Sequence, residues 1–297
     1  MKQLVLWSMV LFAGSALAVG PDTHPLGLTR LKNSAYGGLE GVDGVVQLQA
    51  GHWEGEPPEP GAASVPRVDF VGDLVARGDL DGDGQDEAAV MLVSSFGGTG
   101  VFHYVAVVRQ QGEESRNVAT IAAGDRIQVR DLRIEEGHVL LDLVRAGPSD
   151  AACCPTEVST LSYGFENGRL TDPVRIGEST TLTPEVLAGQ RWRLAAWNFG
   201  EPAQGRVTLG YADGRFLGNA GCNQYSAPVK AANDYGSIEV GQALSTRKQC
   251  GPDVMSGEQR FLGLLPRVNR FWFLAGQLAL DYGGGDDYGV MYLEREE

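Results

Sequence analysis

The sequence predicts a mainly β, α+β protein built from two domains. Its 297 residues fit two domains of ordinary size, since one domain averages about 150 residues. The 41 glycines and 14 prolines indicate many turns, and frequent turns favour short strands over long helices. A hydrophobic fraction of 43% with 21% charged residues is typical of a globular protein with packed cores.

Residues 1–18 have the features of a secretory signal peptide. Lys2 supplies a positive start, Leu4 to Phe12 are mostly apolar, and Ala16-Leu17-Ala18 is a small-x-small cleavage site. The apolar run is too short for a membrane span, and the polar Gly20-Pro21-Asp22 follows it. We therefore expect a periplasmic or secreted protein with no membrane insertion after cleavage.

The charge balance narrows the range of partners. The formal net charge is −14, and cleavage of the signal removes only Lys2, which leaves −15. Nucleic acids and anionic membrane surfaces both require patches of Lys and Arg. We therefore expect no nucleic-acid partner, and solubility alone accounts for the acidic charge.

The pattern along the chain divides it into four parts after the signal. Residues 19–44 show little periodicity and are expected to be a loose N-terminus. Residues 45–170 alternate between strand-like runs and turns, which predicts an antiparallel β-rich domain; the Asn167-Gly168 turn is a strong hairpin signal. Residues 171–183 are polar and rich in turn formers, so we expect a linker there, followed by a C-terminal domain over residues 184–297.

An acidic loop in the first domain has the spacing of a calcium ligand set. Asp79, Asp81 and Asp83 occupy positions 1, 3 and 5, and Gly84 follows at position 6. Alternate side chains in such a loop converge on one hard cation. The glycine permits the tight turn, and the carbonyl of Gln85 is free to add an oxygen.

The second half of the loop departs from an EF-hand. Position 12 is Val90 rather than an acid, and Glu87 at position 9 is the available closing ligand. The stretch instead resembles the strand-flanked calcium loops of FG-GAP and integrin-like repeats, although a single copy excludes a propeller of such repeats. The alternative is a solvated acidic turn without metal. Because close carboxylates repel by about 1 kcal/mol per pair even in water, we predict calcium as a structural cofactor.

The first domain also resembles a recurrent segment of bacterial envelope proteins, and this resemblance implies no activity. It rests on four motifs in a fixed order, which are Gly78–Gly84, Gly97–Gly100, Gly124–Val129 and Cys153–Thr156. The adjacent Cys153 and Cys154 form a vicinal disulfide in one interpretation, which would present a rigid apolar knuckle to a ligand. In the other interpretation each pairs elsewhere or stays a buried thiol.

The C-terminal part contains the most specific motifs of the chain. They are Trp192, the Gly-x-x-Gly-Cys-Asn of Gly218–Asn223, Ser245-Thr246-Arg247 shortly before Cys250, Glu258 on a following helix, and Phe271-Trp272-Phe273. Over about residues 184–296 this set resembles the META domain, the HslJ-like family of heat-inducible and secreted bacterial proteins. The resemblance implies a curved antiparallel sheet with one principal helix. A helix starting at Pro252 is also supported by apolar residues at helical spacing.

Cys222 and Cys250 of this module are either a catalytic thiol with a partner or a structural disulfide. Cysteines in an exported chain are expected to be oxidised. A catalytic thiol needs a general base, and the sequence has no histidine beyond His138. We favour the disulfide, which would stabilise the fold by about 3.5 kcal/mol in the loop-entropy model. We also expect the side chains of Asn223 and Arg247 to form hydrogen bonds with the turns beside this disulfide.

No enzyme signature was found, so we predict a non-catalytic protein. The sequence lacks a Gly-x-Ser-x-Gly elbow, a His-Glu-x-x-His motif, a phosphate loop and a dinucleotide fingerprint. We predict an exported protein that binds or stabilises cell-envelope components under stress, with an envelope protein or a small ligand as partner. The alternatives are a protease inhibitor or small-ligand module, and more distantly a calcium-dependent hydrolase.

Overall fold

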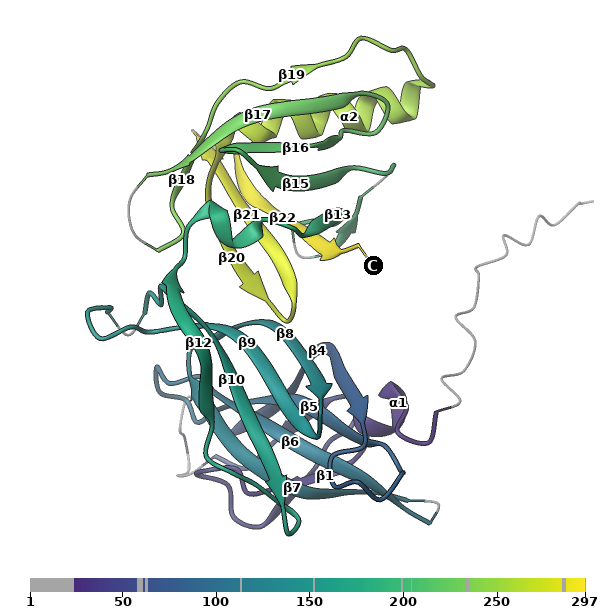
Figure 1. Cartoon of the computed structure of the whole chain (residues 1–297), viewed down its shortest axis with the longest axis vertical. Coiled ribbons are helices and arrows are strands. Elements are labelled where there is room, and N and C mark those ends of the chain that lie inside the picture. Colours follow the sequence, from purple (N-terminus) through teal and green to yellow (C-terminus); the bar gives the residue numbers. More distant parts are fainter. Residues whose placement is uncertain are drawn as a thin grey trace, which may run out of the picture.

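The computed structural model describes residues 24–296 except 58–60, 62–63, 113, 152, 199, 204, 233–234 and 285–286. The expected signal peptide, residues 1–18, lies outside the described residues. The chain is mostly β with one principal helix, and its N-terminal and C-terminal parts stack on each other (Figure 1). Within these described ranges, no helix has the length and apolar character needed to cross a membrane.

Two antiparallel sheets pack face to face in the N-terminal part. The first contains β3 (His52–Glu54), β4 (Arg67–Gly78), β5 (Glu87–Ser95), β6 (Phe102–Gln111) and β7 (Glu114–Asp125). The second contains β8 (Gln128–Glu135), β9 (His138–Arg145), β10 (Glu157–Glu166), β11 (Arg169–Leu170) and β12 (Val174–Thr181). Met91 and Val105 of the first sheet share a core with Leu141 and Tyr163 of the second.

Strand β5 is buried on both of its faces, which explains its continuous apolar run. Successive side chains of a strand point to opposite faces. Ala89 and Met91 face the second sheet, whereas Val90 and Leu92 belong to a separate core on the other side. That outer core is covered by the segment containing α1 (Leu28–Leu31), β1 (Ala35–Gly37) and β2 (Val45–Gln47).

The expectation of a loose N-terminus is therefore wrong for residues 24–44. Leu26, Leu31, Tyr36 and Leu39 are buried against the first sheet, and the Tyr36 hydroxyl donates to the Leu31 carbonyl at 2.8 Å. Burial of apolar surface stabilises this segment by about 25 cal/mol per Å². The contacts are made by isolated residues with the sheet, so they leave no periodic pattern in the sequence.

The expected linker also contains a strand. β12 pairs antiparallel with β10, with Leu161 opposite Arg175 and Val158 opposite Thr180. Most side chains of β12 are exposed, because the strand lies at the edge of its sheet (Figure 1). Exposure explains the polar composition that made the segment resemble a linker. Only a few residues separate this strand from the C-terminal part.

The C-terminal part is one ten-stranded antiparallel sheet with a helix. The strand order is β18-β17-β16-β15-β13-β22-β21-β20, with β14 beside β13 and β19 beside β17. The bounds are η1 (Pro184–Leu187), β13 (Arg191–Trp197), β14 (Glu201–Pro202), β15 (Thr208–Ala212), β16 (Arg215–Asn219), β17 (Gln224–Ala231), β18 (Ile238–Val240), β19 (Leu244–Ser245), α2 (Pro252–Leu264), η2 (Leu265–Arg267), β20 (Val268–Leu274), β21 (Gln277–Gly284) and β22 (Asp287–Arg295).

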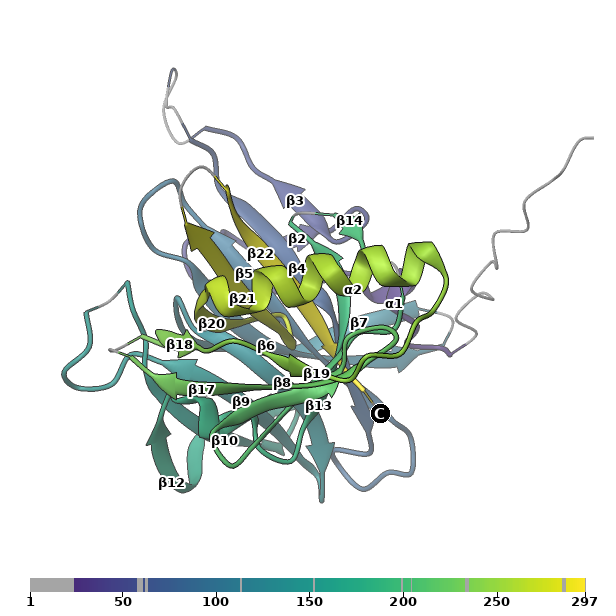
Figure 2. The same cartoon turned by 90° about the horizontal axis from the view of Figure 1, so that it is seen from above.

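This sheet curls until its two ends meet, as the resemblance implied. An isolated bridge joins Ser237, next to β18, to Arg270 of β20, and the Phe271 amide donates to the Gly236 carbonyl at 2.9 Å. Seen from above, the helix α2 lies in front of the strands (Figure 2). Phe261 of α2 packs edge-on against Tyr225 with ring centroids 5.2 Å apart. Trp192, the first residue of the C-terminal motif set, is 1% exposed and lies in the core of this part.

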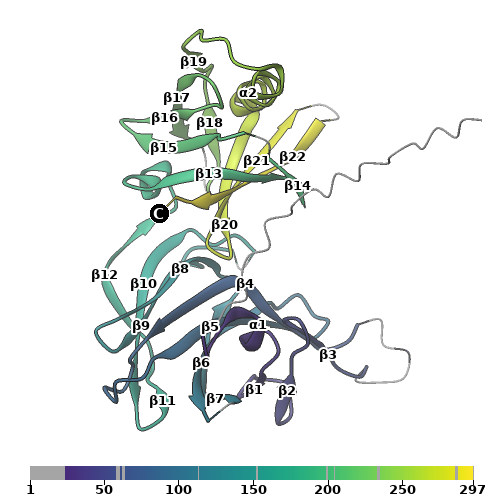
Figure 3. The ribbon, with the colours of Figure 1, turned by 90° about the vertical axis from the view of Figure 1, so that its right-hand side faces the viewer.

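The two parts meet at the turn between β20 and β21 (Figure 3). Ala275 and Gly276 both have positive φ, at 50° and 83°, which is the signature of a tight hairpin turn. The Gly276 amide donates to the Val129 carbonyl of β8 at 3.0 Å, and the Phe273 amide donates to the Gln128 side chain at 2.9 Å. The turn therefore docks directly on the N-terminal part.

Candidate functional site

The acidic loop lies between β4 and β5, so it is flanked by strands as expected. Asp79 organises it, because its two carboxylate oxygens accept the amides of Gly82 at 2.7 Å and Gly84 at 2.9 Å. Both glycines have positive φ, a backbone conformation that residues with a side chain adopt only with strain. The hydrogen bond from the Gly84 amide is the largest cause that lowers the pKa of Asp79 below its usual range. Desolvation opposes it, and the hydrogen bond from the Gly82 amide adds to the lowering.

The structure brings three of the five predicted metal ligands together. One carboxylate oxygen from each of Asp79, Asp81 and Glu87 lies within 4.8 Å of the others. Asp83 instead accepts the amide of Gln85 at 2.8 Å, and both of these side chains are exposed. The carboxylate cluster therefore contains three of the four predicted acids, Asp79, Asp81 and Glu87, and the ligand role of the Gln85 main-chain carbonyl stays a prediction.

An arginine that the sequence did not single out contacts this cluster. The Nε of Arg109 donates to Glu87 at 2.8 Å, and its Nη2 donates to Asp81. The Glu87 side chain is fully buried, and its second oxygen accepts the Leu80 amide at 3.0 Å. Arg109 therefore relieves the carboxylate repulsion from which we predicted a metal. Its approach depends on the pairing of β5 with β6, in which Ala88 lies opposite Val108.

The residues present fit a calcium ion only in part. Each carboxylate offers about four lone-pair positions, so Asp79 and Asp81 keep acceptor capacity beside their hydrogen bonds. Arg109 donates to one oxygen of Asp81 and one oxygen of Glu87, so an ion bound by these two acids would share them with the guanidinium. Calcium at this loop stays a prediction.

The adjacent cysteines Cys153 and Cys154 are bonded to each other, as the first interpretation expected. They lie in an exposed loop between β9 and β10. Asp150 holds that loop, because its carboxylate accepts the Gly147 amide at 2.8 Å and both the amide and hydroxyl of Thr156. The hydrogen bonds of Asp150 therefore hold the loop that carries the Cys153–Cys154 disulfide.

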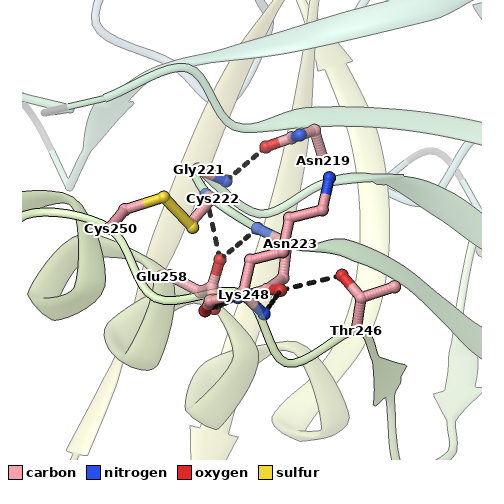
Figure 4. Close-up of a disulfide and its surroundings, with 8 residues drawn as sticks. All are labelled: Asn219, Gly221, Cys222, Asn223, Thr246, Lys248, Cys250 and Glu258. Carbon is pink, nitrogen blue, oxygen red and sulfur yellow. Dashed lines mark hydrogen bonds between the residues drawn. A yellow bond between two sulfur atoms is a disulfide. The ribbon is translucent and has the colours of Figure 1, made fainter.

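The second disulfide joins Cys222 to Cys250, with their Cα atoms 6.0 Å apart. Beside it, α2 buries Glu258, which is 4% exposed. One oxygen of Glu258 accepts the amides of Cys222 at 3.0 Å and Asn223 at 2.7 Å, and the other accepts the Asn223 side-chain amide at 2.7 Å (Figure 4). A single carboxylate thus satisfies three donors of the turn after β16.

Asn223 continues this network to the segment before Cys250. Its side-chain oxygen accepts the Lys248 amide at 2.6 Å and the Thr246 hydroxyl at 2.8 Å, and its nitrogen also donates to the Lys248 carbonyl (Figure 4). The expected structural role of Asn223 is confirmed. The matching expectation for Arg247 is wrong, because its side chain is exposed while its two neighbours make the contacts.

Gly218 and Gly221 of the motif are each required for a different structural reason. A Cβ at Gly218 would collide with the Thr208 carbonyl of the neighbouring strand, so only glycine permits this close pairing. Gly221 has φ of +128°, a conformation that favours glycine, and its amide donates to the Asn219 side chain at 2.7 Å.

These residues are the ones on which the resemblance rested, and the comparison agrees. Residues 185–295 match the META domain. The META family consists of non-catalytic, often exported, stress-associated proteins. No curated protein and no solved structure matches the chain. In the part of the chain that matches the META domain, the motif residues Asn223 and Glu258 form a closed hydrogen-bond network that holds the disulfide-bridged turn on α2.

Proposed function

We propose that this protein is exported and binds or stabilises components of the bacterial cell envelope during stress, without catalysis. The observation that carries the proposal is the use of the META motif for structure. Both oxygens of Glu258 and both polar atoms of Asn223 are occupied by hydrogen bonds within the domain. The motif therefore stabilises the folded domain, and we expect an envelope component to bind to other residues on the surface of that domain.

Fractionation of a Gram-negative host that expresses the whole chain tests this proposal. We expect a mature chain that begins at Val19 and is recovered outside the cytoplasm. A membrane-impermeant cross-linker added to intact spheroplasts should join it to a discrete envelope component, because binding to a specific partner saturates.

A variant lacking residues 2–18 is the matched control and should stay in the cytoplasm without the adduct. A full-length chain in the cytoplasm would refute export. An exported mature chain that forms no saturable adduct would refute envelope binding and leave export standing.

We also propose calcium as a structural cofactor of the loop from Asp79 to Glu87, supported by the convergence of three carboxylates. Calcium titration calorimetry on the oxidised mature protein should then show one site. That site should disappear in the Asp81→Ala, Asp83→Ala double variant, because Asp81 is one of the three converging acids and Asp83 is a further acid of the predicted ligand set. Absence of binding heat together with an unchanged melting temperature would show that Arg109 alone neutralises the loop.

A further inference from the structure

A cavity of about 400 Å³ lies where the two parts of the chain meet. It is lined by Gly72–Leu74 of β4, Arg130 and Asp131 of β8, the docking turn Ala275–Gln277, and Glu294 with Arg295 of β22. Its volume is within the range of small-molecule sites, about 300–1,000 Å³. The walls combine bare glycine backbone and apolar side chains with several charged groups.

The acidic groups around this cavity all have partners. Lys32 contacts Asp73 at 2.7 Å, and Arg193 contacts Glu294 at 2.6 Å. Asp131 is paired with Arg295 at 3.1 Å. None of these carboxylates therefore needs a cation from a ligand.

Arg130 is the exception among the charged groups of the cavity. Among the described residues, no carboxylate lies within ion-pair distance of its guanidinium. Its Nη2 donates to the Val186 carbonyl at 3.0 Å, its guanidinium stacks over Phe273 at 4.9 Å, and its buried Nε has no hydrogen-bond partner.

Burial acts against the charge of Arg130, and the neighbouring charges act in both directions. Burial, which is the largest cause, lowers the pKa of Arg130. Asp142 and Asp131 oppose this effect at a distance, whereas Arg295 adds to it. A buried charge that lacks a direct ion-pair partner destabilises a folded protein. A bound anion would supply that charge.

We propose that this cavity binds a small monocarboxylate, with Arg130 as the ion-pair partner of its carboxylate group. The planar guanidinium matches a carboxylate in geometry and makes strong charge-assisted hydrogen bonds with it. The acids Asp73, Asp131 and Glu294 disfavour a doubly charged anion. The oxygens of these acids can accept hydrogen bonds from polar groups of the ligand, and the side-chain amide of Gln277 can both donate and accept them. Amino-acid derivatives and peptide C-termini have this chemistry. The inference goes beyond envelope binding and does not depend on export.

Calorimetric titration of the purified full chain with N-acetylglycine tests the proposal. We expect saturable binding that is at least about tenfold weaker for N-acetylglycinamide, which has the same shape without the charge. Arg130→Gln should weaken N-acetylglycine binding by a similar factor. Arg145→Gln is the matched control, because Arg145 pairs with Glu157 at 2.7 Å and neither residue lines the cavity.

A second variant keeps the test decisive if Arg130→Gln does not fold. Gln277→Glu changes one group on the cavity wall and should weaken carboxylate binding by charge repulsion. The proposal is overturned if N-acetylglycine and its amide bind equally, if neither binds, or if the Arg130 and Gln277 variants bind like the wild type. Tighter binding of inorganic phosphate than of N-acetylglycine would overturn the assignment of the ligand as a monocarboxylate.

Discussion

Glu258→Ala should lower the free energy of unfolding of the META domain by about 3–5 kcal/mol, since a buried donor left without a partner costs about 1–3 kcal/mol. Three donors lose their acceptor in this variant, namely the amides of Cys222 and Asn223 and the Asn223 side chain. For a domain of about 100 residues this corresponds to a fall in melting temperature of about 15 °C or more.

Thermal and urea unfolding of the oxidised protein measure this change. Gln259→Ala is the matched control, because Gln259 is the next residue of α2 and its side chain is exposed. We expect the control to stay within about 0.5 kcal/mol of the wild type. A Glu258→Ala variant as stable as the control would show that the network does not hold the domain together.

Arg109→Ala should destabilise the N-terminal part by about 3–5 kcal/mol, the usual cost of leaving a buried charge without its partner. The variant removes the only described cation that contacts the fully buried Glu87, and it also releases Asp81. Urea unfolding followed by circular dichroism measures the loss. If the loop binds calcium, added calcium should restore part of the stability, since the ion can replace the guanidinium.

Two further variants separate the ion pair from simple packing. A Glu87→Leu, Arg109→Met double variant removes both charges and should be more stable than Arg109→Ala, because no buried charge is left unpaired. Arg116→Ala changes an exposed arginine on β7 and should have little effect. Equal losses in the double variant and in Arg109→Ala would mean that Arg109 acts through its packing.

Several features could be predicted from the sequence because their causes are local. The acidic loop follows from the spacing of Asp79 and Asp81 with glycines that the turn requires. The start of α2 follows from Pro252, and the resemblance to the META domain follows from Gly218 to Asn223 and Glu258. The sequence allowed two interpretations of Cys153 and Cys154, and the structure bonds them to each other.

Other features could not be predicted because they depend on contacts between distant segments. The residues before Val45 carry no periodic pattern, and their burial depends on the apolar outer face of β5. Arg109 meets Glu87 only through the register of two strands. Likewise, the polar stretch around Arg175 became a strand because β10 offered an unpaired edge.

The sequence by itself determined the β-rich class, the loop chemistry and the motif of the C-terminal module, since short-range spacing and glycine conformations encode them. Only the tertiary structure decided which charges are neutralised and where a cavity forms. Asp81 and Glu87 pair with Arg109. Among the described residues, no carboxylate contacts the guanidinium of Arg130, which lines the cavity where the turn of Ala275 and Gly276 docks. The physical reason is that Coulomb interactions and burial depend on distance in space, and sequence spacing does not specify that distance.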